Sequence, residues 1–123
     1  SIEIVYCNHF INVLMNLHFC FAKRLKLQSS MIDLQDMDYY GLELLLTRTN
    51  LKYLTFQNCY FLSLKQLLWA TKFVKVFVDD CTIETATMNE LWQVVRYNNE
   101  VLGGDAWHFK VVNAMKMELD LST

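Results

Sequence analysis

The stretch "LKYLTFQNC", Leu51 to Cys59, reads as a β-strand that ends on a cysteine. Its apolar residues follow the spacing Leu51-x-x-Leu54-x-Phe56-x-x-Cys59, and their alternation is typical of a half-buried strand. The Cys59 thiol could be a metal ligand, a nucleophile, half of a disulfide or a small residue that only packs. Recurrence of the spacing elsewhere in the chain helps to choose among these four roles.

Three other segments repeat this spacing, beginning at Ala22, Phe73 and Ala106, and a shortened copy begins at Ile2. The copies end on small residues, which are Cys7, Ser30, Cys59, Cys81 and Ala114. These end residues are 23, 29, 22 and 33 positions apart. Three of these intervals fall within the period of about 20–29 residues that is usual for leucine-rich repeats, and the last is longer.

Between the strands the apolar period changes to about 3.6 residues, which predicts a helix in each interval. Phe10 and Trp92 fall on these apolar stripes, so we expect both rings in the core. The four predicted stripes are Phe10, Val13, Leu14 and Leu17; Met37, Gly41, Leu44 and Leu45; Leu64, Leu67 and Leu68; and Met88, Leu91, Trp92 and Val95.

The pattern predicts an α/β fold with about five parallel strands and four helices. Right-handed crossovers would coil these units into a short leucine-rich-repeat-like solenoid, with the helices on the convex side. An ordinary three-layer α/β domain is the alternative, but it has no reason to repeat a small residue three positions after each strand's last apolar residue. We expect residues 1–123 to form a single recognition domain that belongs to a longer chain, because residue 1 is a serine and a strand follows at once.

The composition argues against several classes of protein. Apolar residues make up 54% of the 123 and charged residues 20%, with a net charge of −2 and no basic cluster, so no nucleic-acid partner is expected. No apolar run reaches the roughly 18–20 residues that a membrane span needs. With three glycines and no proline, the chain offers no phosphate-binding glycine loop, and we expect no cofactor.

A metal site is a further candidate, because Cys7, His9, His18 and Cys20 form a symmetrical pattern. If residues 9–18 are helical, the two histidines are about 13 Å apart at about 1.5 Å of rise per residue. One zinc ion needs all its ligands at about 2.0–2.3 Å and could not bind both histidines. We therefore predict no metal.

A catalytic thiol needs a histidine or a helix N-terminus to lower its pKa. Cys59 and Cys81 precede helices, but no histidine is near them in the sequence. Exchange of Cys with Ser30 and Ala114 at one repeat position is tolerated by packing and not by a nucleophile. We therefore predict that the protein is not an enzyme, and that its cysteines are free thiols of a cytoplasmic or nuclear protein.

The alternate strand positions face away from the helices and offer a surface to a partner. Arg and Lys supply charge-assisted donors and aromatic rings supply rigid contact area, so this surface suits an acidic or phosphorylated peptide. A merely solvated strand face is the alternative. The predicted surface has one row of Arg24, Tyr53, Lys75 and His108 and a second row of Lys26, Thr55, Phe77 and Lys110.

One family resemblance covers about a third of the chain. The segments "LSLKQLL" (Leu62–Leu68), "VKVFVDDCTIETATMNELWQVV" (Val74–Val95) and "NNEVLGG" (98–104) resemble the type 2 F-box-associated domain of nematode F-box proteins. In that family a helix begins Leu-Asn-x-Phe-Leu-x-x-Trp and is followed by Gly-Ser-Asn-Pro. Here Met88 to Leu91 match the helix start, whereas Trp92 comes early and the Gly-Ser and Pro are missing.

The resemblance implies the substrate-binding region of a receptor for a cullin-type ubiquitin ligase. The F-box that contacts the ligase adaptor is not among these 123 residues, so docking to the ligase is assigned to none of them. The family brings no catalytic residues. A leucine-rich-repeat scaffold or inhibitor without a link to ubiquitin transfer is the alternative.

Overall fold

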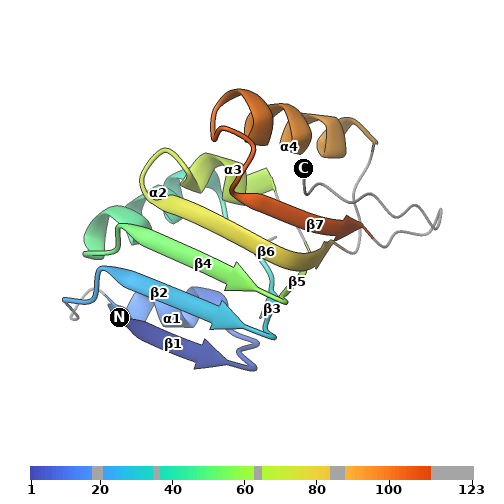
Figure 1. The fold of residues 1–123 in the computed structure, drawn as a ribbon. Helices are drawn as coiled ribbons and strands as arrows, with labels where there is room; N and C mark the ends of the chain where they lie inside the picture. Colours follow the sequence, from blue (N-terminus) through green and yellow to red (C-terminus); the bar gives the residue numbers. More distant parts are fainter. Residues whose placement is uncertain (18–20, 35–36, 63–64, 84–87, 112–123) are drawn as a thin grey trace.

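The computed structural model describes residues 1–17, 21–34, 37–62, 65–83 and 88–111. These residues form an α/β fold in which the strands alternate with four helices (Figure 1). The elements are β1 (Ile2–Val5), α1 (Phe10–Asn16), β2 (Arg24–Gln28), β3 (Met31–Ile32), α2 (Tyr39–Arg48), β4 (Tyr53–Gln57), β5 (Tyr60–Phe61), α3 (Lys65–Ala70), β6 (Lys75–Ile83), α4 (Met88–Glu100) and β7 (Trp107–Val111).

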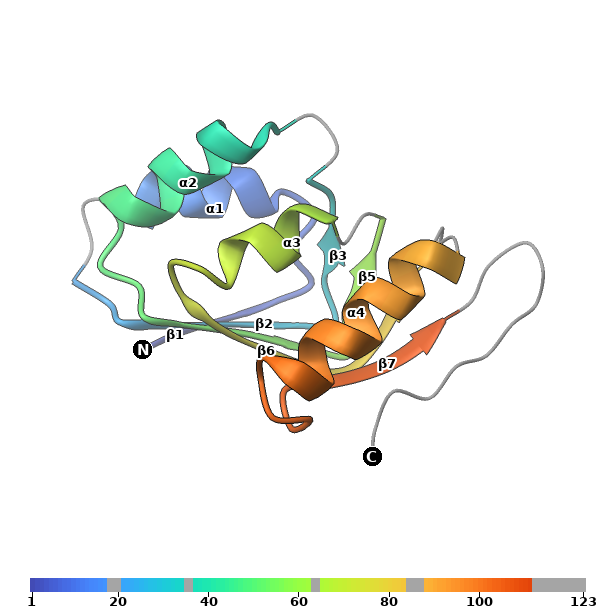
Figure 2. The same ribbon diagram turned by 90° about the horizontal axis from the view of Figure 1, so that it is seen from above.

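The strands form one curled, open sheet in which every pairing is parallel. β1, β2, β4 and the first part of β6 lie side by side, while the last part of β6 pairs with β5 and β5 with β3. β7 also pairs with β6. Figure 2 shows α1, α2 and α3 on one side of the sheet, with α4 close to β7. The predicted α/β class, parallel strands and four helices are confirmed. The described residues form seven strands instead of about five, because the short strands β3 and β5 pair beyond the corners of β2 and β4.

A sharp corner follows β1, separates β2 from β3 and β4 from β5, and lies within β6. The residue before each described repeat-end residue has a positive φ, a left-handed conformation that strains residues other than glycine. Neighbouring corners are joined by backbone hydrogen bonds, in which the N–H groups of Tyr6, Ser29 and Asn58 donate to the carbonyls of Gln28, Gln57 and Asp79. The four corner residues are Tyr6, Ser29, Asn58 and Asp80, with φ between 51° and 60°.

The core lies between the sheet and the helices, and the inward strand residues fill it. At its centre the Phe56 ring contacts the Phe10 ring, with centroids 5.4 Å apart, and the Phe61 ring at 5.1 Å, both edge-on. The predicted inward residues Leu25, Leu27, Leu54, Phe56, Val76 and Val78 are all buried. The alternation read from the sequence is therefore correct on these three strands.

The predicted stripe of α1 is correct, because Phe10, Leu14 and Leu17 are buried. The predicted stripe of α2 is correct only in part. Met37 and Leu45 pack against the core, but Leu42 and Leu46 are the fully buried leucines and Leu44 is 54% exposed. The Asp38 carboxylate accepts the N–H of Gly41 at 2.6 Å as the N-cap, and the helix begins at Tyr39.

The predicted core position of Trp92 was also wrong, because this side chain is 58% exposed. Val94 and Asn98, four residues apart on α4, are buried. A polar residue on the buried side of a helix breaks the apolar periodicity from which the phase was inferred. Among the described residues, no helix is long and apolar enough to cross a membrane.

β7 does not continue the two rows of outward residues, which corrects the predicted alignment of His108 with Lys75 and of Lys110 with Phe77. Trp107 pairs with Val78 and Lys110 with Thr82, with an irregularity between Val78 and Cys81. β6 runs on past its corner at Asp80, and β7 follows this second part. The predicted repeat end at Ala114 lies outside the described residues.

Candidate functional site

The side of the sheet opposite α1, α2 and α3 carries the outward side chains of four strands, and we call it the open face (Figure 2). Backbone pairing sets these side chains in rows that run across the strands. The rows are Arg24, Tyr53 and Lys75; then Glu3, Lys26, Thr55 and Phe77; and then Val5, Gln28, Gln57 and Asp79. For β2, β4 and β6, the rows agree with those predicted from the sequence.

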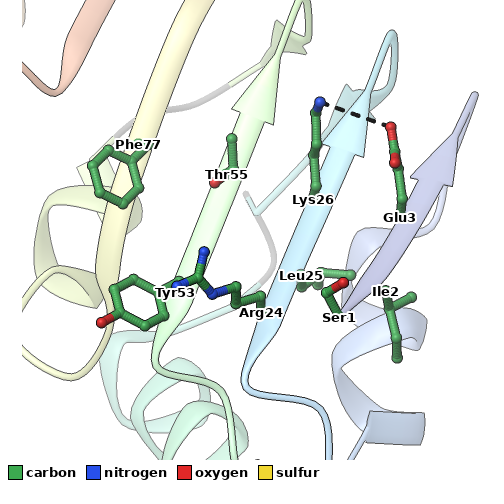
Figure 3. A pocket seen from close by; sticks show the side chains of 9 residues that line it. All are labelled: Ser1, Ile2, Glu3, Arg24, Leu25, Lys26, Tyr53, Thr55 and Phe77. Carbon is green, nitrogen blue, oxygen red and sulfur yellow. Dashed lines mark ion pairs between the residues drawn. The ribbon is translucent and has the colours of Figure 1, made fainter.

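A shallow depression of about 230 Å³ lies over the first two rows (Figure 3). Its position follows from the equal lengths and the unbroken register of β2 and β4, which keep their outward side chains level. The residues that line it are Ser1, Ile2, Glu3, Arg24, Leu25, Lys26, Tyr53, Thr55 and Phe77. Five of the eight residues predicted to bind a partner are among them.

Two of the cations on this face lie over aromatic rings. The Arg24 guanidinium carbon is 4.7 Å from the centroid of the Tyr53 ring, and the Lys75 ammonium is 5.4 Å from that of Phe77. Such contacts position a cation without neutralising its charge. The rows therefore keep their positive character.

The third cation, Lys26, is paired differently, because its ammonium lies 3.7 Å from a carboxylate oxygen of Glu3. Both side chains are well exposed, at 40% for Lys26 and 58% for Glu3, and exposed ion pairs contribute little to stability. Glu3 is a residue of the site that the sequence analysis did not identify. Its signal was the alternation in "IEIV", which places Glu3 on the same side as the outward residues of β2.

The third row differs in chemistry from the first two. It holds the amides of Gln28 and Gln57 and the carboxylate of Asp79, and Asp80 follows at the corner. The open face therefore changes from basic and aromatic at the strand starts to amide and acidic at the strand ends. On β2, β4 and the described part of β6 before the corner, the positive charges of this face therefore lie in the first half of the strands.

The remaining predicted site residues do not join the depression. Lys75 lies in the first row but does not line it, and His108 is half-buried on β7. The backbone of Lys110 is opposite Thr82, past the corner of β6. The register of β7 thus removes His108 and Lys110 from the rows where they were expected.

The repeat-end residues form a buried hydrogen-bonded ladder along the corners. The N–H of Cys7 donates to the Ser30 hydroxyl at 2.9 Å, and the N–H of Cys59 donates to the Cys81 sulfur at 3.3 Å. The Cys59 thiol lies 3.4 Å from the carbonyl oxygen of Leu27 and can donate to it. These side chains satisfy backbone groups that the corner would otherwise leave buried and unpaired.

Two cysteines of the ladder are shielded from solvent, because Cys59 is 2% exposed and Cys81 is 0% exposed. The side-chain hydrogen bond between the two thiols raises the pKa of Cys81 and lowers that of Cys59 to about 7. Burial acts to raise the pKa of both. Cys7, Cys59 and Cys81 are free thiols. Cys59 is a small buried residue that packs at the corner and forms hydrogen bonds there. Among the four roles considered for its thiol, this favours the packing role.

Within the described ranges, no group of three or more His, Cys, Asp or Glu side chains could hold a metal ion. His18 and Cys20 of the predicted zinc pattern lie outside these ranges. No protein-family model, curated protein or solved structure matches the chain. The resemblance to F-box-associated domains therefore stays a prediction.

Proposed function

We propose that the protein is a recognition module whose open face binds an acidic or phosphorylated peptide. One observation carries this proposal: Arg24, Lys26, Tyr53, Thr55 and Phe77, from three strands, surround a single depression. Two of the three cations on these rows lie over aromatic rings. On a chain with a net charge of −2, a basic and aromatic surface marks a place where an anion is preferred.

The architecture that we propose is a short leucine-rich-repeat-like solenoid. Its support is the regular recurrence of strand, left-handed corner residue, small buried residue and helix along the chain. The ladder at the corners also joins each repeat to the next by backbone and side-chain hydrogen bonds. In such an arc each repeat contacts mainly its neighbours, and the sheet offers an extended binding surface.

Within this class, we place the chain as the substrate-binding region of an F-box-type ubiquitin ligase receptor. The support is the sequence resemblance over Leu62–Leu68 and Val74–Val95. Contact with a cullin-ligase adaptor would run through an F-box, which is not among these residues, and the protein would act in the cytoplasm or nucleus. A repeat scaffold or inhibitor outside ubiquitin transfer remains the second candidate.

Binding of acidic peptides tests the recognition function directly. Peptides with a fixed central Asp or Glu among random neighbours should be retained by the protein and lost by the Arg24→Gln variant. Arg48→Gln is the matched control, because Arg48 is an exposed arginine on α2, on the helix side of the sheet. Equal retention by both variants would remove the open face as the binding site.

Affinity purification of the full-length protein from cell extract separates the two candidates. Recovery of a cullin-ligase adaptor together with a peptide-competed partner supports the ubiquitin ligase receptor. Recovery of the partner without the adaptor supports the scaffold. Ligase activity would need no residue of this chain to react with substrate.

A catalytic thiol makes a different prediction from a binding module. Because Cys59 and Cys81 are buried, alkylation by iodoacetamide should be slow in the native protein and fast once denaturant opens the fold. Mass spectrometry of the labelled peptides measures both rates. Fast native labelling of Cys59 would favour the enzyme.

A further inference from the structure

The depression on the open face contains a single acidic side chain, Glu3, among the described residues that line it. It pairs with Lys26 across the edge of the sheet, from strand β1 to strand β2. Glu3 thus takes up one cation of a site that otherwise presents positive charge. An anionic ligand that uses Lys26 competes with this carboxylate for the ammonium.

The other polar groups of the depression are arranged differently. Figure 3 shows the Arg24 guanidinium between the Tyr53 ring and the Thr55 side chain, while the Lys26 ammonium is directed to Glu3. The charge of Arg24 lies over the Tyr53 ring and is not paired with Glu3. The Lys26 ammonium is fully available only after its exposed ion pair opens, which requires little free energy.

We propose that Glu3 is a built-in competitor for Lys26, and that the depression selects a phosphorylated peptide side chain over a carboxylate. The inference rests on the proposed recognition function. A ligand carboxylate that replaces Glu3 at Lys26 exchanges one monoanion for another and gains little there. A phosphoryl group carries about −1.5 to −2 charges and three acceptor oxygens, so it can engage Arg24, Thr55 and Lys26 together.

A peptide is the occupant that fits the surroundings of the depression. The rings of Tyr53 and Phe77 offer apolar contact to the stem of a phosphorylated residue. The neighbouring row offers the amides of Gln28 and Gln57, which can donate to and accept from a peptide backbone. A free phosphate ion would use neither the rings nor the amides.

The probes are three peptide libraries with random neighbours and a fixed central phosphoserine, glutamate or serine, used with inorganic phosphate as a fourth ligand. Fluorescence anisotropy with labelled libraries gives apparent affinities. The wild-type protein should bind the phosphoserine library about tenfold or more tightly than the glutamate library, the fold-change expected for one further charge-assisted hydrogen bond.

A double-mutant cycle then tests the role of Glu3. Glu3→Gln should tighten phosphoserine binding about two- to fivefold, the value of one exposed ion pair. The same change in a Lys26→Gln background should have a clearly smaller effect, because nothing is left to compete for. Glu100→Gln is the matched control, since it removes another exposed ion pair, with Arg96 on α4, and should not change binding.

Each possible result of these binding measurements overturns a different part of the proposal. An equal effect of Glu3→Gln in both backgrounds would mean plain repulsion and would overturn competition. Equal affinity for the phosphoserine and glutamate libraries would overturn phosphate selection while the recognition function stands. Inorganic phosphate binding as tightly as the phosphopeptides would overturn a peptide occupant. Binding of no library would overturn the proposed function together with this inference.

Discussion

Two regions of the sheet differ in how regularly their strands pair. β2, β4 and the first part of β6 pair residue for residue from Arg24, Tyr53 and Lys75 onward, without interruption. β7 instead pairs with β6 across an irregularity between Val78 and Cys81 and continues beyond the corner. Unbroken register keeps outward side chains in rows, so the first region can build a site. The second region cannot extend those rows.

The second region, around β7, contributes a buried side chain to the core. Trp107, the first residue of β7, is fully buried, as is Phe56 at the centre of the regular region. Both lie in one continuous core. The difference between the regions therefore concerns the outer side of the sheet, while the inner side is shared. Mutations of core residues, which should affect stability, and of open-face residues, which should affect binding, test this division.

The largest effects are expected from the shared core. Phe56→Ala and Trp107→Ala should each lower the free energy of unfolding by about 3–5 kcal/mol, because each leaves a cavity where a large ring was buried. Urea unfolding followed by both fluorescence and circular dichroism measures the change. The two variants should each unfold in a single transition.

A separate early transition in Trp107→Ala alone would contradict a shared core. It would mean that β7 and α4 unfold independently of the regular strands. Tyr40→Ala on α2 is the control for the loss of an aromatic ring. That side chain is 77% exposed, and its removal should change stability by less than about 0.5 kcal/mol.

The corner ladder should show intermediate effects. Cys81→Ala removes the acceptor of the buried Cys59 N–H and should cost about 1–3 kcal/mol. Cys81→Ser should cost less, because Ser30 already accepts the equivalent N–H of Cys7 through its hydroxyl. Thermal and urea unfolding compare the two variants. Equal stability of Ala and Ser variants would contradict the ladder and leave Cys81 as a packing residue only.

A smaller effect is expected at the left-handed corner of β4. Asn58 has a φ of 51°, so Asn58→Ala should destabilise by about 1 kcal/mol, whereas Asn58→Gly should be near neutral. Asn8→Ala is the control, because Asn8 is exposed and its φ is not positive. A loss in Asn58→Gly as large as in Asn58→Ala would show that the side chain and not the backbone matters at this corner.

The sequence was sufficient to predict the parallel strands, their inward residues and the rows on β2, β4 and β6. It was insufficient for β7 because β6 offers two apolar pairs at the same spacing. Phe109 and Val111 can align with Val76 and Val78 or with Cys81 and Ile83, and the structure uses the second pair. Alternation fixes which side a residue faces, and it does not fix how far one strand slides along another.

The stripe of α2 was wrong in part for a related reason. Leu44, Leu45 and Leu46 are consecutive, so two helical stripes are almost equally apolar, and periodicity does not show which one packs against the sheet. Glu3 was missed because β1 was considered only as a shortened repeat. Its partner Lys26 becomes visible only once the register of β1 against β2 is known.

The last and smallest stability effect concerns the outer side, where the two regions should differ most in binding. Lys75→Glu should leave the melting temperature nearly unchanged, since the side chain is exposed, and should weaken binding of acidic peptides by about tenfold. Lys110→Glu should leave binding unchanged, because its backbone pairs with Thr82 and not with Phe77. Anisotropy with the same peptide library compares them. If both variants lost affinity equally, the ligand would extend past the corner onto β7, and the site would not be confined to the strands in unbroken register.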